Sequence, residues 1–192
     1  MRPILQVEDD PNDVFFLQHA MTKAGVANPV HVATDGQQAI DYLRGVGKFA
    51  DRKQFPLPCL VLLDLKLPHV MGLEVLKWIR QESGLPLAVV MLTASSEDAD
   101  ISTAYRLGAN GFLVKPSEVD KLVNMAKAIS AFWLTHNELP RESFRERTAT
   151  PARSPIVVPA TKSLAATIGA RREEWHPMMS KQTYEEGHSV AL

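Results

Sequence analysis

The sequence contains a single cysteine, Cys59, among its 192 residues. One cysteine excludes a disulfide within the chain and any cysteine-based zinc site, and it fits a reducing cytoplasm. No apolar run approaches the roughly 18–20 residues that span a bilayer. The first ten residues reach acidic side chains too soon for a signal peptide. We therefore expect a cytoplasmic protein that has no membrane segment.

An excess of charge of either sign is also absent. The 21 lysines and arginines nearly balance the 22 aspartates and glutamates, which leaves a formal charge of −1 at pH 7. Such a chain has no general attraction for nucleic acid or for an anionic membrane, so we expect neither as a partner. Hydrophobic residues make up 45% of the sequence, which is enough for the core of one domain of ordinary size.

Five apolar segments alternate with five segments of helical periodicity between residues 2 and 136. The apolar segments are residues 3–7, 29–33, 60–63, 85–92 and 111–114, and each predicts a short buried strand. In the segments that follow them, apolar residues recur at spacings of three and four, as in an amphipathic helix. This alternation predicts an α/β fold over residues 1–140, in which a five-stranded parallel sheet is doubly wound with five helices.

Two segments do not fit the alternation. Residues 45–58 have the composition of a loop and exceed the usual connection length, which indicates an insertion or a binding loop. Residues 141–192 are rich in Pro, Ser, Thr, Ala, Arg and Glu and have weak periodicity, so we expect a largely irregular tail. Within it, only residues 163–175 could form a short helix, with Leu164, Ile168 and Trp175 on a narrow stripe.

Polar side chains follow the predicted strands at the points where the strands end. Glu8, Asp9 and Asp10 follow the first strand, Asp64 the third, Thr93 the fourth and Lys115 the fifth. The carboxyl ends of parallel strands share one edge of the sheet, so these residues should converge on one pocket. Carboxylates placed so closely repel one another unless a cation lies among them. A site made of oxygen ligands suits Mg²⁺, which also retains waters that a phosphate can replace.

The same residues supply what phosphoryl transfer to a carboxylate requires. Asp64 is the candidate nucleophile, and the ammonium group of Lys115 can pair with it and with an incoming phosphoryl oxygen. The hydroxyl of Thr93 can donate to another phosphoryl oxygen. A nucleophile, a metal and a positive charge would then surround the transferred group.

In this order and on these elements, Glu8-Asp9-Asp10, Asp64, Thr93-Ala94 and Lys115-Pro116 resemble the receiver domain of two-component response regulators, over about residues 2–136. The resemblance implies a flavodoxin-like fold and phosphorylation of Asp64 by a histidine kinase, with Mg²⁺ as cofactor. It implies that Asp9 is the main carboxylate ligand of the metal beside Asp64. Glu8 would assist through water, and the backbone carbonyl of Lys66 would be a further ligand.

The resemblance also implies how phosphorylation would change the conformation of the domain. Thr93 would be the switch hydroxyl, and Phe112 would be the aromatic residue that swings inward once Thr93 moves; the alternative is that Phe112 is a core residue with no such role. Lys115 would contact the phosphate, with a cis peptide before Pro116. Lys66, Ala94 and Ser95 would flank the acyl-phosphate. Such a domain catalyses only its own phosphotransfer and autodephosphorylation, so we do not expect an enzyme in the ordinary sense.

A narrower resemblance concerns the partners. The long loop before the third strand and the segment of residues 132–140 are similar to single-domain receivers that serve phytochrome-type histidine kinases. That similarity implies a homodimer, and a last helix that carries Met125, Phe132 and Trp133 is compatible with one. The sequence departs from many receivers at Met71, where an aspartate commonly precedes the glycine, and at Phe112, where a tyrosine would add a hydroxyl.

Three other functions remain open at this point. The tail could bind DNA, but about fifty residues of low periodicity show no recognition helix. A phosphatase of the aspartyl-phosphate type would need a second aspartate two positions after the nucleophile, and Lys66 stands there. The domain could also be an interaction module that is never phosphorylated.

Overall fold

The computed structural model describes residues 1–94 and 96–138. The predicted domain boundary at residue 140, the tail of residues 141–192 and its optional helix at 163–175 lie outside the described residues, as does Ser95. None of the helices in the described part of the chain is long and apolar enough to cross a membrane.

Five parallel strands form one sheet, in the order β2-β1-β3-β4-β5. The strands are β1 (Ile4–Val7), β2 (Val30–Ala33), β3 (Leu60–Leu63), β4 (Ala88–Thr93) and β5 (Gly111–Val114). The central strand β3 pairs with β1 and β4, with Ile4 opposite Leu60 and Leu63 opposite Met91. All four of its residues are buried, as expected when helices cover both faces. The predicted doubly wound α/β fold is confirmed.

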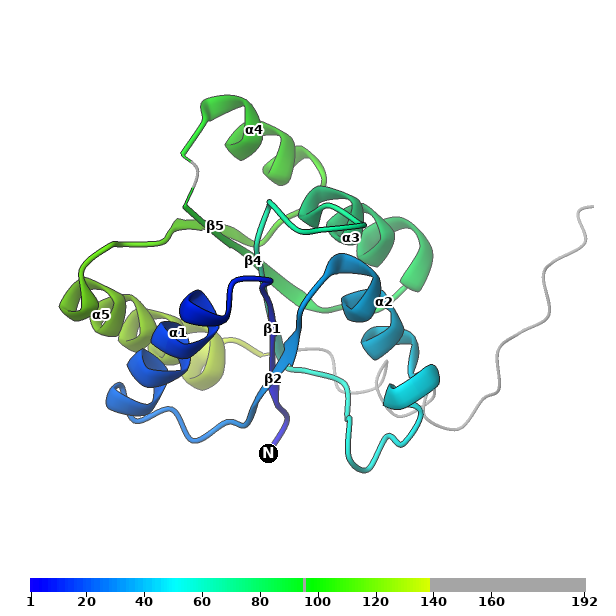
Figure 1. The fold of residues 1–192 in the computed structure, drawn as a ribbon, viewed down its shortest axis with the longest axis horizontal. Helices are drawn as coiled ribbons and strands as arrows, with labels where there is room; N and C mark the ends of the chain where they lie inside the picture. Colours follow the sequence, from blue (N-terminus) through cyan, green and yellow to red (C-terminus); the bar gives the residue numbers. More distant parts are fainter. Residues whose placement is uncertain (95, 139–192) are drawn as a thin grey trace, which may run out of the picture. The chain divides into compact units, whose positions relative to one another are not determined.

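Helices cover the two faces of the sheet unequally (Figure 1). The helices are α1 (Pro11–Lys23), α2 (Gly36–Arg44), α3 (Gly72–Trp78), α4 (Asp98–Arg106) and α5 (Val119–Ile129), and wider turns extend α3 over Ile79–Ser83 and α5 over Ser130–His136. Along β3, Leu60 and Leu62 face the core made with α1 and α5, whereas Val61 and Leu63 face the core made with α2, α3 and α4. This alternation is the period of two that a strand imposes.

The fourth strand begins later than its apolar pattern predicts. The sequence predicts a strand over residues 85–92, but the hydrogen-bonded strand runs from Ala88 to Thr93. Leu85 and Leu87 are buried without belonging to the strand. The reason is Pro86, which has no N–H group to give to a neighbouring strand. Burial and strand pairing therefore begin at different residues.

The long loop before β3 packs inward. The guanidinium group of Arg52 donates to the carbonyl oxygens of Tyr42 at 2.7 Å, Leu43 at 2.6 Å and Phe55 at 3.1 Å, so it satisfies the end of α2. Phe49 and Phe55 lie against the ring of Tyr42. The hydroxyl of Tyr42 donates to the carbonyl of Pro56, and burial raises the pKa of Tyr42 to about 12. The loop therefore extends the core of the domain.

His31 in β2 should make the stability of this region depend on pH. Its ring lies against the rings of Tyr42 and Phe55, its Nδ1 is 2.8 Å from the Tyr42 hydroxyl, and burial lowers the pKa of His31 from 6.5. The unfolded chain therefore binds a proton more readily than the folded chain, so the free energy of unfolding should fall as pH drops through and below 6.5. Urea unfolding of the wild type and of His31→Phe over this range measures the effect. An equally steep decline in His31→Phe would contradict the assignment.

Candidate functional site

The structure brings the strand-end residues to one edge of the sheet. Glu8 and Asp9 follow β1, Asp64 follows β3, Thr93 ends β4 and Lys115 follows β5. An open cleft of about 610 Å³ lies there, and its lining residues are Glu8, Asp9, Asp10, Asp13, Asp64, Lys66, Thr93, Ala94, Ser96, Glu97 and Lys115. The predicted convergence of residues far apart in the sequence is therefore found in the structure.

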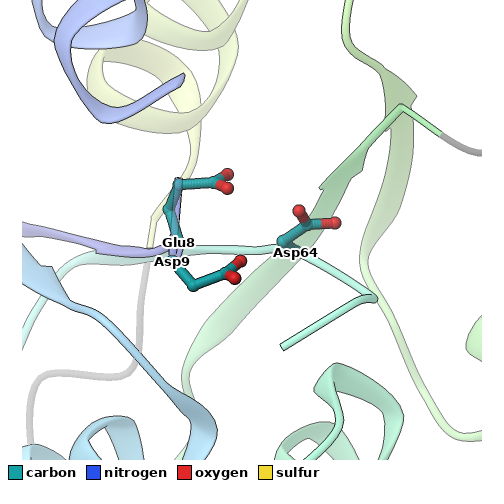
Figure 2. Close-up of side chains that lie close together, drawn as sticks. All are labelled: Glu8, Asp9 and Asp64. Carbon is teal, nitrogen blue, oxygen red and sulfur yellow. The ribbon is translucent and has the colours of Figure 1, made fainter. Parts of the chain in front are cut away.

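Three carboxylates in this cleft could hold a metal ion. One oxygen from each of Glu8, Asp9 and Asp64 lies within 4.8 Å of the other two (Figure 2). Oxygen ligands at such separations fit the coordination sphere of a small hard cation such as Mg²⁺ or Mn²⁺. Asp9 is exposed, whereas Glu8 and Asp64 are buried, so the ion would lie between the sheet edge and solvent. The residues present therefore fit a divalent cation.

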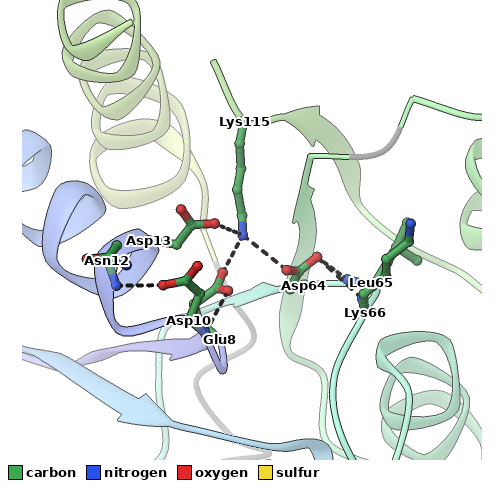
Figure 3. A network of polar contacts seen from close by, with 8 residues as sticks. All are labelled: Glu8, Asp10, Asn12, Asp13, Asp64, Leu65, Lys66 and Lys115. Carbon is green, nitrogen blue, oxygen red and sulfur yellow. Dashed lines mark hydrogen bonds and ion pairs between the residues drawn. The ribbon is translucent and has the colours of Figure 1, made fainter. Parts of the chain in front are cut away.

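Lys115 contacts three of the acids in the cleft (Figure 3). Its Nζ donates to Asp13 Oδ2 at 2.7 Å and to Asp64 Oδ2 at 3.0 Å, and it makes an ion pair with Glu8. Burial alone would lower the pKa of Lys115, but the bonds to Asp13 and Glu8 and the charge of Asp64 outweigh that effect and raise it. The ammonium group therefore stays charged and holds β1, β3 and β5 together at this edge.

The carboxyl group of Glu8 is the most buried of the acids in the cleft, with the residue only 3% exposed. Burial raises the pKa of Glu8 above 4.5, and the charge of Asp64 acts in the same direction. Lys115 opposes both effects through its hydrogen bond and its charge. Lys115 therefore favours the ionised form of Glu8, and a second cation beside it would act in the same direction.

Asp64 is held from two sides. Its Oδ1 accepts a hydrogen bond from the backbone N–H of Leu65 at 2.6 Å, and its Oδ2 accepts one from Lys115. The residue is 8% exposed. With its rotation fixed by the backbone, the carboxylate presents Oδ2 to the cleft, where Lys115 reaches it (Figure 3).

The remaining predicted residues are not all in the cleft. Thr93, Ala94 and Lys66 line it, and Thr93 is buried. Phe112 is half-buried and packs against the core on the α2, α3 and α4 side of the sheet. Pro116 lines a separate cavity beside the cleft.

The cis peptide expected before Pro116 is not found. No cis peptide bond occurs over the described residues, so the Lys115–Pro116 bond is trans. Trans is preferred to cis in such bonds by only about 0.5–1 kcal/mol, which is too little for a motif alone to decide the isomer. The expectation was therefore wrong, although the position of Lys115 was predicted correctly.

Asp13 is a site residue that sequence reasoning missed. It lies in the first turn of α1, and its carboxylate reaches Lys115 across the cleft. Asp10 caps this helix by accepting a hydrogen bond from Asn12 N at 2.8 Å, and Pro11 fixes its first residue. The capping pattern was visible in the sequence and places residue 13 one turn above the end of β1. That was the signal that could have identified Asp13.

The family model of the response regulator receiver domain matches residues 4–127. The chain belongs to this family. Among curated relatives of the receiver domain, it is 36% identical over 141 residues to the probable methanogenesis regulatory protein FilR2 of Methanothrix harundinacea, covering 71% of this chain and 86% of that protein. It is 34% identical over 138 residues to response regulator Rcp1 of Synechocystis, covering 71% of this chain and 92% of Rcp1.

Solved structures of receiver domains include close matches. The crystal structure of the phosphorylated cyanobacterial phytochrome response regulator RcpA matches with a TM-score of 0.67 and 35% identity, covering 72% of this chain and 98% of RcpA. The Mn²⁺-bound form of Rcp1 matches with a TM-score of 0.65 and 33% identity, covering 73% of this chain and 99% of that structure. The receiver fold is shared along the aligned part of the chain, and one such relative binds a divalent cation.

Proposed function

We propose that this receiver domain accepts a phosphoryl group on Asp64 from the phosphohistidine of a sensor histidine kinase. The observation that carries the proposal is the bond from Lys115 Nζ to Asp64 Oδ2 beside the metal-competent carboxylates. An Asp64 oxygen attacks phosphorus, so a P–O bond forms while the P–N bond to the histidine breaks. The electron pair of that bond returns to the imidazole, and the product is an acyl-phosphate.

The side chains around Asp64 would each serve one part of this transfer. Lys115 already donates to the attacking carboxylate and would move its donation to a phosphoryl oxygen as negative charge is added there. A divalent cation on Glu8, Asp9 and Asp64, with the Lys66 carbonyl as a further ligand, would neutralise the phosphoryl oxygens. We take this ion to be Mg²⁺. Lys66, Ala94 and Ser95 would set the access of water to the product.

A small phosphodonor tests the proposal without the kinase. With acetyl phosphate and Mg²⁺, intact-mass spectrometry should show one added phosphoryl group per chain, and a chelator should abolish the addition because the three carboxylates then lack their cation. Magnesium restored after chelation should restore labelling. Labelling that proceeds equally well with the chelator present would refute the metal-assisted mechanism.

Phosphorylation would be communicated through Thr93 and Phe112. The Thr93 hydroxyl would turn toward the phosphoryl group, and Phe112 on the neighbouring strand would fill the space it leaves. Thr93 on β4 is paired in register with Val114 on β5, two residues after Phe112. A change at Thr93 would therefore reach the face formed by α4, β5 and α5.

That face would bind a second copy of the chain or another protein in the cytoplasm. Tyr105, Val114 and Phe132 are exposed large hydrophobic residues on α4, on β5 and just beyond α5, which supports a homodimer through the last helix and its neighbours. The similarity to RcpA supports a phytochrome-type kinase as the partner. Light scattering with and without beryllofluoride measures the first point, and a monomer under both conditions would exclude the dimer.

The other functions have weaker support. Receiver domains are in general not classical enzymes, and Lys66 stands where an aspartyl-phosphate phosphatase would need an acid. A tail that binds DNA would involve residues outside those the structure describes. A module that is never phosphorylated has no need for Lys115 and six acids in one cleft, so no observation favours it.

A further inference from the structure

Three carboxylates share the ammonium group of Lys115. A lysine ammonium group has three N–H groups to donate. In the structure they go to Glu8, to Asp13 Oδ2 at 2.7 Å and to Asp64 Oδ2 at 3.0 Å (Figure 3). The N–H group on Asp64 can pass to a phosphoryl group that this carboxylate would carry. A second N–H group for the same phosphoryl group must come from Glu8 or from Asp13.

Glu8 and Asp13 differ in how easily they can release Lys115. The side chain of Glu8 is 4% exposed, so little water could take the place of the ammonium group there. A buried carboxylate that loses its partner is strongly destabilised. The side chain of Asp13 is 41% exposed, and water can hydrate it once Lys115 moves away. Asp13 is therefore the acid that releases the ammonium group with the smaller loss of stability.

The place of Asp13 in its helix does not by itself explain the contact with Lys115. An acid in the first turn of a helix stabilises the N-terminus, and Asp98 and Asp120 have that place in α4 and α5 as Asp13 has it in α1. Of these three aspartates, Asp13 is the one that forms an ion pair with Lys115. Its bond is shorter than the bond from Lys115 to Asp64, so the ammonium group lies nearer to Asp13.

Phosphorylation would change the balance between Asp13 and Asp64. The ionised carboxylate of Asp64 carries one negative charge, whereas an acyl-phosphate there would carry about two at neutral pH. The ammonium group of Lys115 is attracted more strongly toward Asp64 as that charge is added. Asp13 acts against this shift, because it attracts the same ammonium group from the first turn of α1.

We propose that Asp13 is a positioning residue that competes with the phosphoryl group on Asp64 for the ammonium group of Lys115. This role rests on the proposed phosphorylation of Asp64. Before phosphorylation, Asp13 keeps one N–H group of Lys115 on the α1 side of the cleft. After phosphorylation, that N–H group passes to a phosphoryl oxygen and water hydrates Asp13. The site consequently holds a phosphoryl group less tightly than it would without Asp13.

Beryllofluoride mimics a phosphoryl group on Asp64 and measures this competition without a kinase. With Mg²⁺ present, the Asp13→Ala variant should bind beryllofluoride about fivefold more tightly than the wild type in a fluorine NMR titration, because Lys115 then has an N–H group free for it. Asp13→Asn keeps an acceptor oxygen without the charge, and its affinity should lie between the two. Asp120→Ala removes an exposed first-turn aspartate from α5 and should bind as the wild type does.

A second measurement needs neither a metal nor a phosphoryl analogue. In heteronuclear NMR of the metal-free chain, the Nζ protons of Lys115 should exchange with water faster in Asp13→Ala than in the wild type, because one of them has lost its acceptor. Equal exchange rates, or unchanged or weaker beryllofluoride binding by the folded Asp13 variants, would overturn the role of Asp13. A wild type that does not bind beryllofluoride would instead refute the phosphorylation of Asp64, on which this role depends.

Discussion

Replacing Asp64 with asparagine should abolish phosphoryl incorporation from acetyl phosphate, to the background of the assay. Asparagine has nearly the shape of aspartate, but its neutral amide cannot displace the leaving group to form an acyl-phosphate. Lys115 retains Glu8 and Asp13 as partners in this variant, so the fold should persist. Intact-mass spectrometry measures incorporation, and circular dichroism verifies the fold.

Asp120→Asn is the matched control for this experiment. Asp120 is an exposed aspartate in the first turn of α5, and its replacement changes the net charge by the same amount. Labelling of this variant should equal that of the wild type. A phosphoryl group that persists in folded Asp64→Asn would place the acceptor at another residue and would end the assignment of Asp64.

Replacing Gly72 with alanine should destabilise the domain by about 3 kcal/mol, which lowers its melting temperature by about 10 °C. A Cβ atom on Gly72 would lie 1.9 Å from the backbone oxygen of Asp64 and 3.0 Å from the Cα of Leu65. Backbone atoms cannot move aside as a flexible side chain does, so α3 and the end of β3 would have to separate. The displacement would also move the Asp64 side chain, and acetyl phosphate labelling should slow.

Gly111→Ala gives the comparison for that measurement. Gly111 begins β5, and a Cβ atom there would lie 3.6 Å from the nearest side-chain atom, in ordinary contact with Val90. Thermal unfolding should show little change for Gly111→Ala and the large decrease for Gly72→Ala. Equal melting temperatures for the two variants would contradict the prediction, because the backbone near Asp64 would then have moved to accommodate the new Cβ atom at little cost.

The fold could be predicted because apolar residues give way to charged residues where the strands end. The apolar runs end at Glu8, Asp64 and Lys115. In a parallel sheet the carboxyl ends of the strands lie at one edge, so these three residues must lie there together. The acidic cleft therefore followed from order and pattern alone. Its members Glu8, Asp9 and Asp64 lie as close together as that reasoning requires.

Other features depend on distances that the sequence does not contain. Asp13 joins the cleft only because α1 begins at Pro11 and turns back toward the sheet edge. The contact of Gly72 with Asp64 depends on how closely α3 approaches β3. Gln6 stands within an apolar run, and no local pattern shows that it lines a cavity together with Leu122. Such contacts join two helices or strands, whereas a sequence pattern describes only one helix or strand at a time.

The bridge formed by Lys115 also has a consequence for the order in which the site is assembled. Lys115 is 107 positions from Glu8 and 51 from Asp64, so the acids are synthesised long before the cation that neutralises them. A nascent chain that ends before β5 has Glu8 and Asp64 but not their shared counterion. The acidic cleft with its lysine therefore forms only after the last strand has joined the sheet, and a chain that ends before that strand lacks it.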